Sequence, residues 1–329
     1  MVIIYNFLVA LIIIIGGLTR LTDSGLSITK WDLFTGILPP VSSDDWEKFF
    51  FLYKKIPEYK LINSSMTLDQ FKIIYWWEYV HRLLGRAIGL LFMLPLIYLT
   101  FKKKLSKKNL FSFYFILFLI LLQGFVGWYM VKSGLLDRVD VSQYRLSLHL
   151  TLAIIIFCIL FWNYLKNISQ NNFESNVKIS FYLPVIFLII LILQISLGAF
   201  VSGLHAGQIY QSWPLMNQNY FPDDSMFSDL FSLKVFETPS LAQFIHRNVA
   251  YLMLLFFLLI LFIVFKNDEL SYLRKSAILV FLFLLLQLFL GILTIIFGAQ
   301  IFFASMHQLG SIVLLTATLI LVFKNSRIN

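Results

Sequence analysis

The chain has 329 residues, of which 59% are hydrophobic and 13% charged, and its formal net charge is +9. With a mean hydropathy of +0.83, this composition excludes a soluble protein of this size and indicates an integral membrane protein. The excess of basic residues lies in short connections between apolar stretches, so we interpret it as a topology signal and expect no nucleic-acid partner.

Eight apolar stretches follow one another along the chain, each near the length of about 20 residues that a membrane-spanning helix needs. The first lacks the basic start and the small-residue cleavage site of a signal peptide, so we interpret it as a retained helix. The sequence therefore predicts an all-α membrane protein with eight transmembrane helices. The stretches are 2–20, 79–101, 109–131, 144–165, 179–202, 242–265, 276–298 and 301–323.

Basic residues crowd alternate connections. The positive-inside rule places these connections and both termini in the cytoplasm, which leaves the long connections 21–78 and 203–241 on the outer face. We expect a multi-pass protein of the inner cell membrane, in contact with membrane lipid. The basic residues are Lys102, Lys103, Lys104, Lys107, Lys108, Lys166, Lys178, Lys266, Arg274, Lys275, Lys324 and Arg327.

An internal repeat divides the chain into two halves. It predicts two pseudo-symmetric four-helix bundles, residues 1–170 and 171–329, each able to hold one planar cofactor. The repeated segments are Glu-Tyr-Val-His-Arg at 78–82 and Gln-Phe-Ile-His-Arg at 243–247; Leu-Gln-Gly-Phe-Val-Gly at 122–127 and Leu-Gln-Leu-Phe-Leu-Gly at 286–291; and the ends of the first and fifth stretches, Gly17 to Gly25 and Gly198 to Gly207.

Four histidines recur within the repeat, each expected in the first turns of its helix and all near the outer face: His81, His149, His246 and His307. An ionisable ring inside an apolar span is costly, so four at one depth indicate a shared kind of site. Two imidazoles that face each other across a bundle suit the axial positions of a haem iron, and four can hold two haems. Packing alone would not require the same residue at equivalent places, and zinc favours closer spacing with Cys or carboxylate ligands.

Glu78 precedes His81 by about one helical turn, whereas the equivalent position in the second half is Gln243. The acid is either a group that serves a reaction or a carboxylate that the helix dipole favours in a first turn. An acid in only one half is expected if one site does chemistry and the other carries electrons.

Three other residue types remain less specific. Arg82 and Arg247 each follow a histidine and could bind haem propionates, or could anchor helix ends at the interface. His205 lies in a loop without a counterpart and is expected to be structural or near a propionate, not axial. Cys158, the single cysteine, is interpreted as a small buried hydrophobe.

The segment 16–28, Gly-Gly-Leu-Thr-Arg-Leu-Thr-Asp-Ser-Gly-Leu-Ser-Ile, with Trp31 and the histidine motifs, resembles haem A synthase of the branch shared by mitochondria and alphaproteobacteria. The resemblance runs over essentially the whole chain. The motifs are Glu78-x-x-His81-Arg82, His149, His246-Arg247 and His307-Gln308. The other bacterial branch carries a cysteine pair in its first outer loop, which this chain lacks.

The resemblance implies an oxidoreductase acting on a CH or CH2/CH3 group, which converts the C8 methyl of haem O to the formyl group of haem A for haem–copper terminal oxidases. It implies haem b on His246 and His307, and substrate haem O on His81 and His149. The residues agree, because only the N-terminal half has an acid, Glu78, beside its histidine, which could accept a proton, stabilise positive charge or position a water. The chain has no thiolate site of the kind that activates dioxygen, which favours oxidation by electron removal and hydration by water. An unidentified electron acceptor is required, and a haem O synthase and a second copy of the chain stay open as partners.

Two other functions stay open from the residues alone. A bis-His di-haem b membrane cytochrome would only transfer electrons, and would commonly place its haems toward opposite faces. A transporter would also suit parallel repeats and buried ionisable groups, with Pro95 and Pro184 as weak support. Four histidines toward one face argue against the cytochrome, and the single Glu78 and the family motif argue against both functions.

Overall fold

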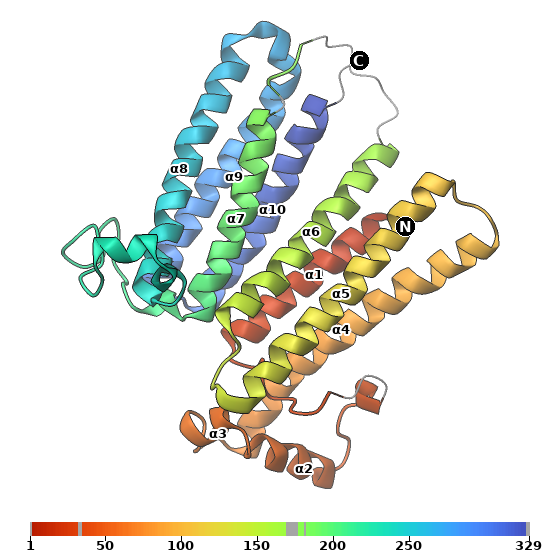
Figure 1. Ribbon diagram of the computed structural model, residues 1–329, viewed down its shortest axis with the longest axis vertical. Coiled ribbons are helices and arrows are strands. Elements are labelled where there is room, and N and C mark those ends of the chain that lie inside the picture. The colour runs from red at the N-terminus through yellow and green to blue at the C-terminus, as the bar shows by residue number, and fades with distance from the viewer. Residues whose placement is uncertain (1, 32–34, 169–176, 181, 327–329) are drawn as a thin grey trace. The chain divides into compact units, whose positions relative to one another are not determined.

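The computed structural model describes residues 2–31, 35–168, 177–180 and 182–326, and within them helices dominate (Figure 1). Eight of the described helices are long and apolar enough to cross a membrane, so the chain is a multi-pass membrane protein. Each predicted span overlaps one of them; Arg327, used as a topology signal, lies outside the described residues. The helices are α1 (Val2–Leu21), α4 (Leu68–Phe101), α5 (Lys107–Asp137), α6 (Gln143–Ile168), α7 (Tyr182–Gly203), α8 (Pro239–Lys266), α9 (Ser271–Ile296) and α10 (Ile301–Ser326).

α4 begins at Leu68, about three turns before the predicted start of its apolar span. Thr67 and Gln70 form a capping box, in which each side chain binds the backbone N–H of the other residue. Glu78 and His81 therefore lie well inside the helix. The prediction that His81 occupies its first turns is wrong, and so is the alternative that Glu78 is a first-turn carboxylate. An apolar-length criterion misses this part of α4, because it is rich in charged and aromatic residues.

The chain divides into two compact units, residues 3–156 and 157–329, with the boundary inside α6. In the second unit α7, α8, α9 and α10 pack in sequence and α10 returns to α7, which closes a four-helix bundle around buried Phe187, Phe257 and Leu284. The connection between α7 and α8 carries the short 3-10 helices η2 (Ala206–Gln208), η3 (Phe227–Phe231) and η4 (Leu233–Phe236). The predicted division at residue 170 stays a prediction.

In the first unit α4 packs along α5, and of two short helices, α2 (Ser43–Tyr53) contacts α4 and α3 (Pro57–Leu61) contacts α5 (Figure 1). Residues 22–31 together with α2 and α3 are called the cap below. α2 starts with a capping box between Ser42 and Asp45. Buried Tyr53 of α2 packs against buried Phe71 of α4, so the cap and the start of α4 share one hydrophobic core.

Candidate functional site

The four predicted histidines form two facing pairs, one in each unit. His81 of α4 and His149 of α6 have ring centroids 6.4 Å apart, and His246 of α8 and His307 of α10 also have ring centroids 6.4 Å apart. An iron that binds one nitrogen of each ring needs roughly 6 Å between ring centres, because metal–imidazole bonds are about 2 Å long. Each pair thus has the separation that two axial haem ligands require.

Each imidazole rests against a glycine of the neighbouring helix. A Cβ at this glycine would lie 2.8 Å from Cε1 of the ring for both first-unit pairs, and 3.3 Å and 3.1 Å from it for the two second-unit pairs. No larger side chain fits at 2.8 Å unless the ring moves. The pairs are Gly16 with His81, Gly127 with His149, Gly198 with His246 and Gly291 with His307.

The ring nitrogens also fit a bound group. Nδ1 of His81, His246 and His307 is buried without a hydrogen-bond partner. A buried polar atom without a partner is costly, so these rings suit a ligand that uses their remaining bonding capacity. Together with the ring separations and the glycine contacts, the residues present fit a bis-imidazole haem in each unit.

Glu78 lies in a buried network of donors, with 2% of its surface exposed. Oε2 accepts hydrogen bonds from Ser27 Oγ and from the backbone N–H of Ile28, both at 2.7 Å. Oε1 accepts from Nε of Arg82 at 3.0 Å and forms a salt bridge with Nη2 at 2.5 Å. All of these partners suit a charged carboxylate, and they tie the cap to α4 one turn before His81.

The Arg82 guanidinium is committed to the same network. Nη2 also donates to the carbonyl of Ile28 at 2.9 Å, and the group lies 4.9 Å from the ring centroid of Trp31. Arg82 thus joins the cap to Glu78. Because α4 begins at Leu68, Arg82 does not anchor a helix end, and its binding to a haem propionate stays a prediction.

The second unit repeats this arrangement without the charge. Gln243 is 1% exposed, and its Nε2 donates to the carbonyls of Ala206 and Tyr210 at 3.0 and 3.2 Å. Arg247 Nη2 donates to Gln243 Oε1 at 3.2 Å and to the Tyr210 carbonyl at 3.1 Å. An acid surrounded by donors in one unit therefore corresponds to an amide that donates to carbonyls in the other.

A family model described as cytochrome oxidase assembly protein matches residues 1–319. The chain belongs to this family. The similar proteins carry the name haem A synthase: that of Pelagibacter ubique is 50% identical over 321 residues, 97% of this chain and 94% of its own length. Those of Rickettsia bellii and Rhizobium etli are 44% and 39% identical, over 95% and 92% of this chain and 93% and 82% of their own lengths.

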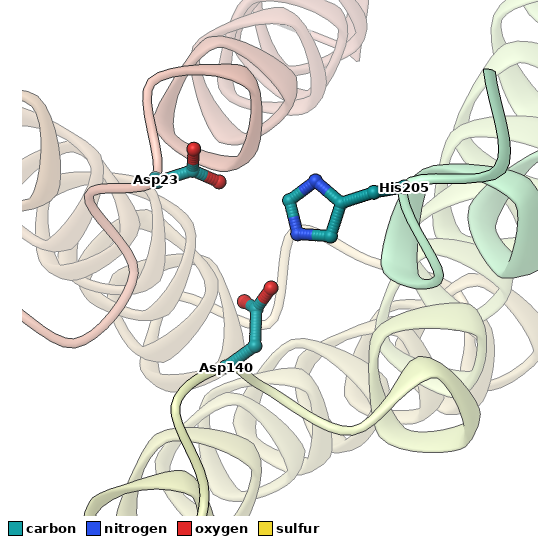
Figure 2. Close-up of side chains that lie close together, drawn as sticks. All are labelled: Asp23, Asp140 and His205. Carbon is teal, nitrogen blue, oxygen red and sulfur yellow. The ribbon is translucent and has the colours of Figure 1, made fainter. Parts of the chain in front are cut away.

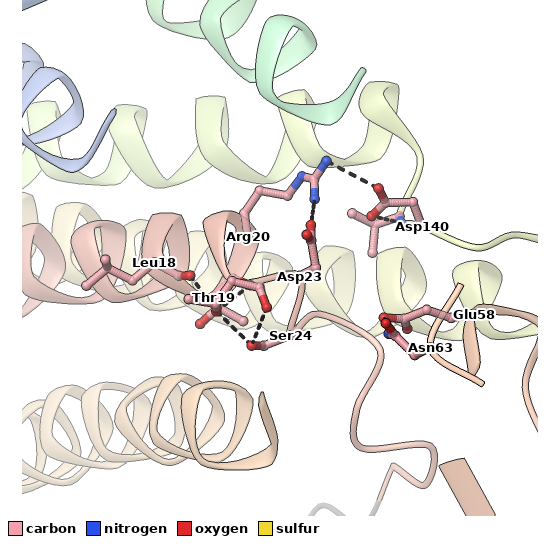
Figure 3. Close-up of polar contacts among 10 residues, drawn as sticks. Leu18, Thr19, Arg20, Asp23, Ser24, Glu58, Asn63 and Asp140 are labelled. Carbon is pink, nitrogen blue, oxygen red and sulfur yellow. Dashed lines mark hydrogen bonds and ion pairs between the residues drawn. The ribbon is translucent and has the colours of Figure 1, made fainter. Parts of the chain in front are cut away.

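In this member of the cytochrome oxidase assembly protein family, the motif segment at the end of α1 holds the first unit together. Arg20 forms salt bridges with Asp23 at 2.7 Å and with Asp140 at 3.2 Å (Figure 3). Figure 2 shows the two carboxylates, which come from the turn after α1 and from the segment before α6. Thr19 Oγ1 donates to the carbonyls of Ile15 and Trp77, which joins α1 to α4 beside Glu78.

His205, also drawn in Figure 2, follows α7 in the second unit with a left-handed backbone, φ 50°. Asp23 has φ 48° after α1, and each of the two residues stands seven positions after the glycine that faces a histidine, Gly198 or Gly16. The positional counterpart of His205 is therefore Asp23, and no histidine of the first half corresponds to it. The equivalent of Gly198 is Gly16 and not Gly17.

Sequence reasoning found the histidines and Glu78 but missed the residues that seat them. The four facing glycines and Ser27 carry no ionisable group, so a search for chemistry does not select them. The available signal was their spacing: Gly127 and Gly291 end the repeated 122–127 and 286–291 segments.

Proposed function

We propose that the chain is a haem A synthase, which oxidises the C8 methyl group of haem O to a formyl group. Membership of the family, the name of the similar proteins and the two histidine pairs support this proposal. The observation that carries it is the difference between the two sites: the histidine pairs are alike, but only the first has a carboxylate, Glu78, one turn away.

In this proposal His81 and His149 bind substrate haem O, and His246 and His307 bind a resident haem b. When bound, haem b would supply one-electron transfer out of the substrate site. The overall conversion adds one water to the methyl group and releases the aldehyde, four protons and four electrons. The electrons pass to an acceptor of the membrane, and we place both sites toward its outer face.

The role proposed for Glu78 follows from its partners. A carboxylate held by Ser27, Ile28 and Arg82 keeps a fixed position and charge beside the histidine. It can accept a proton from a reacting water or offset positive charge that develops at the methyl carbon. Gln243 can do neither, so the second site is suited to electron transfer only.

The experiment that tests this function uses the purified full-length protein. It is given haem O and an oxidant, and the haems are extracted and identified by pyridine haemochrome spectra. We expect haem O to be consumed and haem A to accumulate, while a stoichiometric haem b stays bound. Two b-type haems without any change of the added haem O would instead support a di-haem electron carrier.

A further inference from the structure

Three of the four histidines have a glutamine beside them, and the fourth does not. On α5, α7 and α9 a glutamine lies one helical turn before the glycine that faces the ring. The three segments are Gln123 to Gly127, Gln194 to Gly198 and Gln287 to Gly291. On α1 the residue at this position, four before Gly16, is Ile12.

Two of the glutamines, Gln123 and Gln194, form hydrogen bonds with the helix that carries the ligand. Nε2 of Gln123 donates to the carbonyl of His149 at 3.0 Å and lies 3.1 Å from Nδ1 of the same ring. Nε2 of Gln194 donates to the carbonyl of His246 at 2.8 Å. An amide at this position thus fixes the backbone of the ligand residue to the neighbouring helix.

Gln287 occupies the corresponding place on α9. It is buried, and its Nε2 would lie 2.0 Å from a Cβ at Gly310, one turn after His307 on α10, but this Nε2 has no hydrogen-bond partner among the described residues. The glycine at position 310 therefore makes room for the glutamine against the helix that carries His307.

Ile12 points at the same part of α4 but cannot hold it in the same way. A Cβ at Gly85, one turn after His81, would lie 3.5 Å from Cδ1 of Ile12. An isoleucine side chain has no hydrogen-bond donor, so this contact is one of packing only. Within the first unit, the helix of His149 is thus held by an amide, whereas the helix of His81 has no amide at this level.

We propose that His81 is the exchangeable ligand of the first unit: the iron–His81 bond breaks when substrate haem enters or product haem leaves, while His149 keeps its place. The step changes no oxidation state, because the electron pair of the bond stays on the imidazole. The inference rests on the proposed function, in which the first unit takes the substrate. In the second unit a glutamine stands beside each ligand: Gln194 forms a hydrogen bond with the His246 carbonyl, and Gln287 packs against the helix of His307.

The test puts a glutamine in place of Ile12, and an isoleucine in place of Gln194, in the full-length, haem-loaded protein. Haem loss to an excess of a haem-scavenging apoprotein is followed by absorbance, and extraction identifies which haem has left. We expect Ile12→Gln to slow loss of haem O or haem A about tenfold, the order of effect of one added hydrogen bond, and to leave haem b unchanged. Gln194→Ile should speed the loss of haem b and leave the substrate haem unchanged.

Ile12→Leu is the matched control, because it nearly conserves volume and adds no amide; it should release haem at the wild-type rate. An Ile12→Gln protein that retains haem b but releases substrate haem at the wild-type rate overturns the proposal. If Ile12→Gln does not fold, Gln123→Leu replaces it: faster loss of substrate haem supports the tie at His149, and an unchanged rate overturns it.

One outcome separates this inference from the proposed function. If Ile12→Gln slows the loss of haem b, and Gln194→Ile speeds the loss of haem O or haem A, the effect of the amide holds but the assignment of haems to halves is wrong. Unchanged rates in both variants overturn the inference and leave the assignment untouched.

Discussion

Glu78 and Gln243 show how a single side chain matches its surroundings. Around Glu78 the cap presents a hydroxyl and an N–H group, whereas around Gln243 the loop presents two carbonyls. A carboxylate at position 243 would face two carbonyl oxygens, which cannot donate a hydrogen bond to it. An amide at position 78 would turn its N–H groups toward groups that are themselves donors. The difference in charge between the two sites is thus built into the backbone of the two connections.

Replacement of Glu78 by Gln should lower conversion of haem O to haem A by at least about tenfold, because an amide cannot accept a proton or offset positive charge. Haem content should stay close to that of the wild type. Extraction of haems after incubation with haem O measures both quantities.

The control for this change is Ser27→Ala, which removes one hydrogen bond to Glu78 but keeps its charge. It should retain most of the conversion. A Glu78→Gln protein with near-normal haem A yield would reduce Glu78 to a residue that only ties the cap to α4.

Glu58 of α3 is a buried carboxyl of the cap (Figure 3). Its Oε2 has no hydrogen-bond partner, and burial raises the pKa of this group from 4.5 to about 8. The folded protein therefore holds a proton that the unfolded chain releases near pH 4.5. The contribution of Glu58 to stability is largest below pH 4.5 and is lost as the pH rises to about 8.

Glu58→Gln should remove this part of the pH dependence, because the amide stays neutral. The apparent melting temperature in detergent, measured at pH 5 and pH 8, should fall less for this variant than for the wild type. Glu47→Gln, a change at an exposed carboxylate of α2, is the matched control and should behave as the wild type. An equal fall for Glu58→Gln and the wild type would contradict the assignment.

At the scale of elements, each pair of histidine-bearing helices is expected to bind one haem, so that replacing either histidine of a pair has the same effect. Met in place of His246 or His307 should remove haem b from the isolated protein and lower its stability, because a cofactor that binds only the folded state stabilises it. Met in place of His81 or His149 should spare haem b and abolish haem A formation.

Haem quantitation and extraction on the four single variants measure this difference. Loss of haem b from the His81 and His149 variants alone would reverse the assignment of the halves. Equal partial loss in all four variants would mean that the two sites do not differ in function.

The helices were predictable because hydropathy and repeat spacing report the elements that cross a membrane. The long N-terminal part of α4 was not predictable by the same criterion, since Thr67 and Gln70 cap it outside the apolar span. The site was predictable where it uses ionisable residues, as at His81 and Glu78. The contacts of Ser27 and Gly16 depend on chain crossings that no local pattern reports.

At the scale of the whole molecule, the distribution of basic residues predicts one orientation in the membrane. A reporter that is active only outside the cytoplasm should work when fused near residue 60 or 225, and should fail near residue 105 or 170. Residue 170 lies outside the described residues, but the prediction depends only on Lys166 and Lys178 around it. The reverse pattern would place the histidine pairs toward the cytoplasm.

The two long connections differ in the elements that they form. The first, between α1 and α4, forms α2 and α3 and contributes Tyr53 and Phe50 to a core with α4. The second, between α7 and α8, forms only short 3-10 helices. The unit that carries Glu78 is thus also the one with the larger helical cover.

The glycines that face the imidazoles have a consequence for mutational tolerance. They offer no functional group, yet a methyl group at Gly16 or Gly127 would press on a ring carbon at 2.8 Å. In a saturation scan scored by growth that depends on haem A, these two positions should tolerate substitution as poorly as the histidines themselves. Gly198 and Gly291 should accept alanine more often, because a Cβ there would lie 3.3 and 3.1 Å from the ring carbon. The heaviest genetic constraint outside the ligands would then fall on residues whose only contribution is the space they leave.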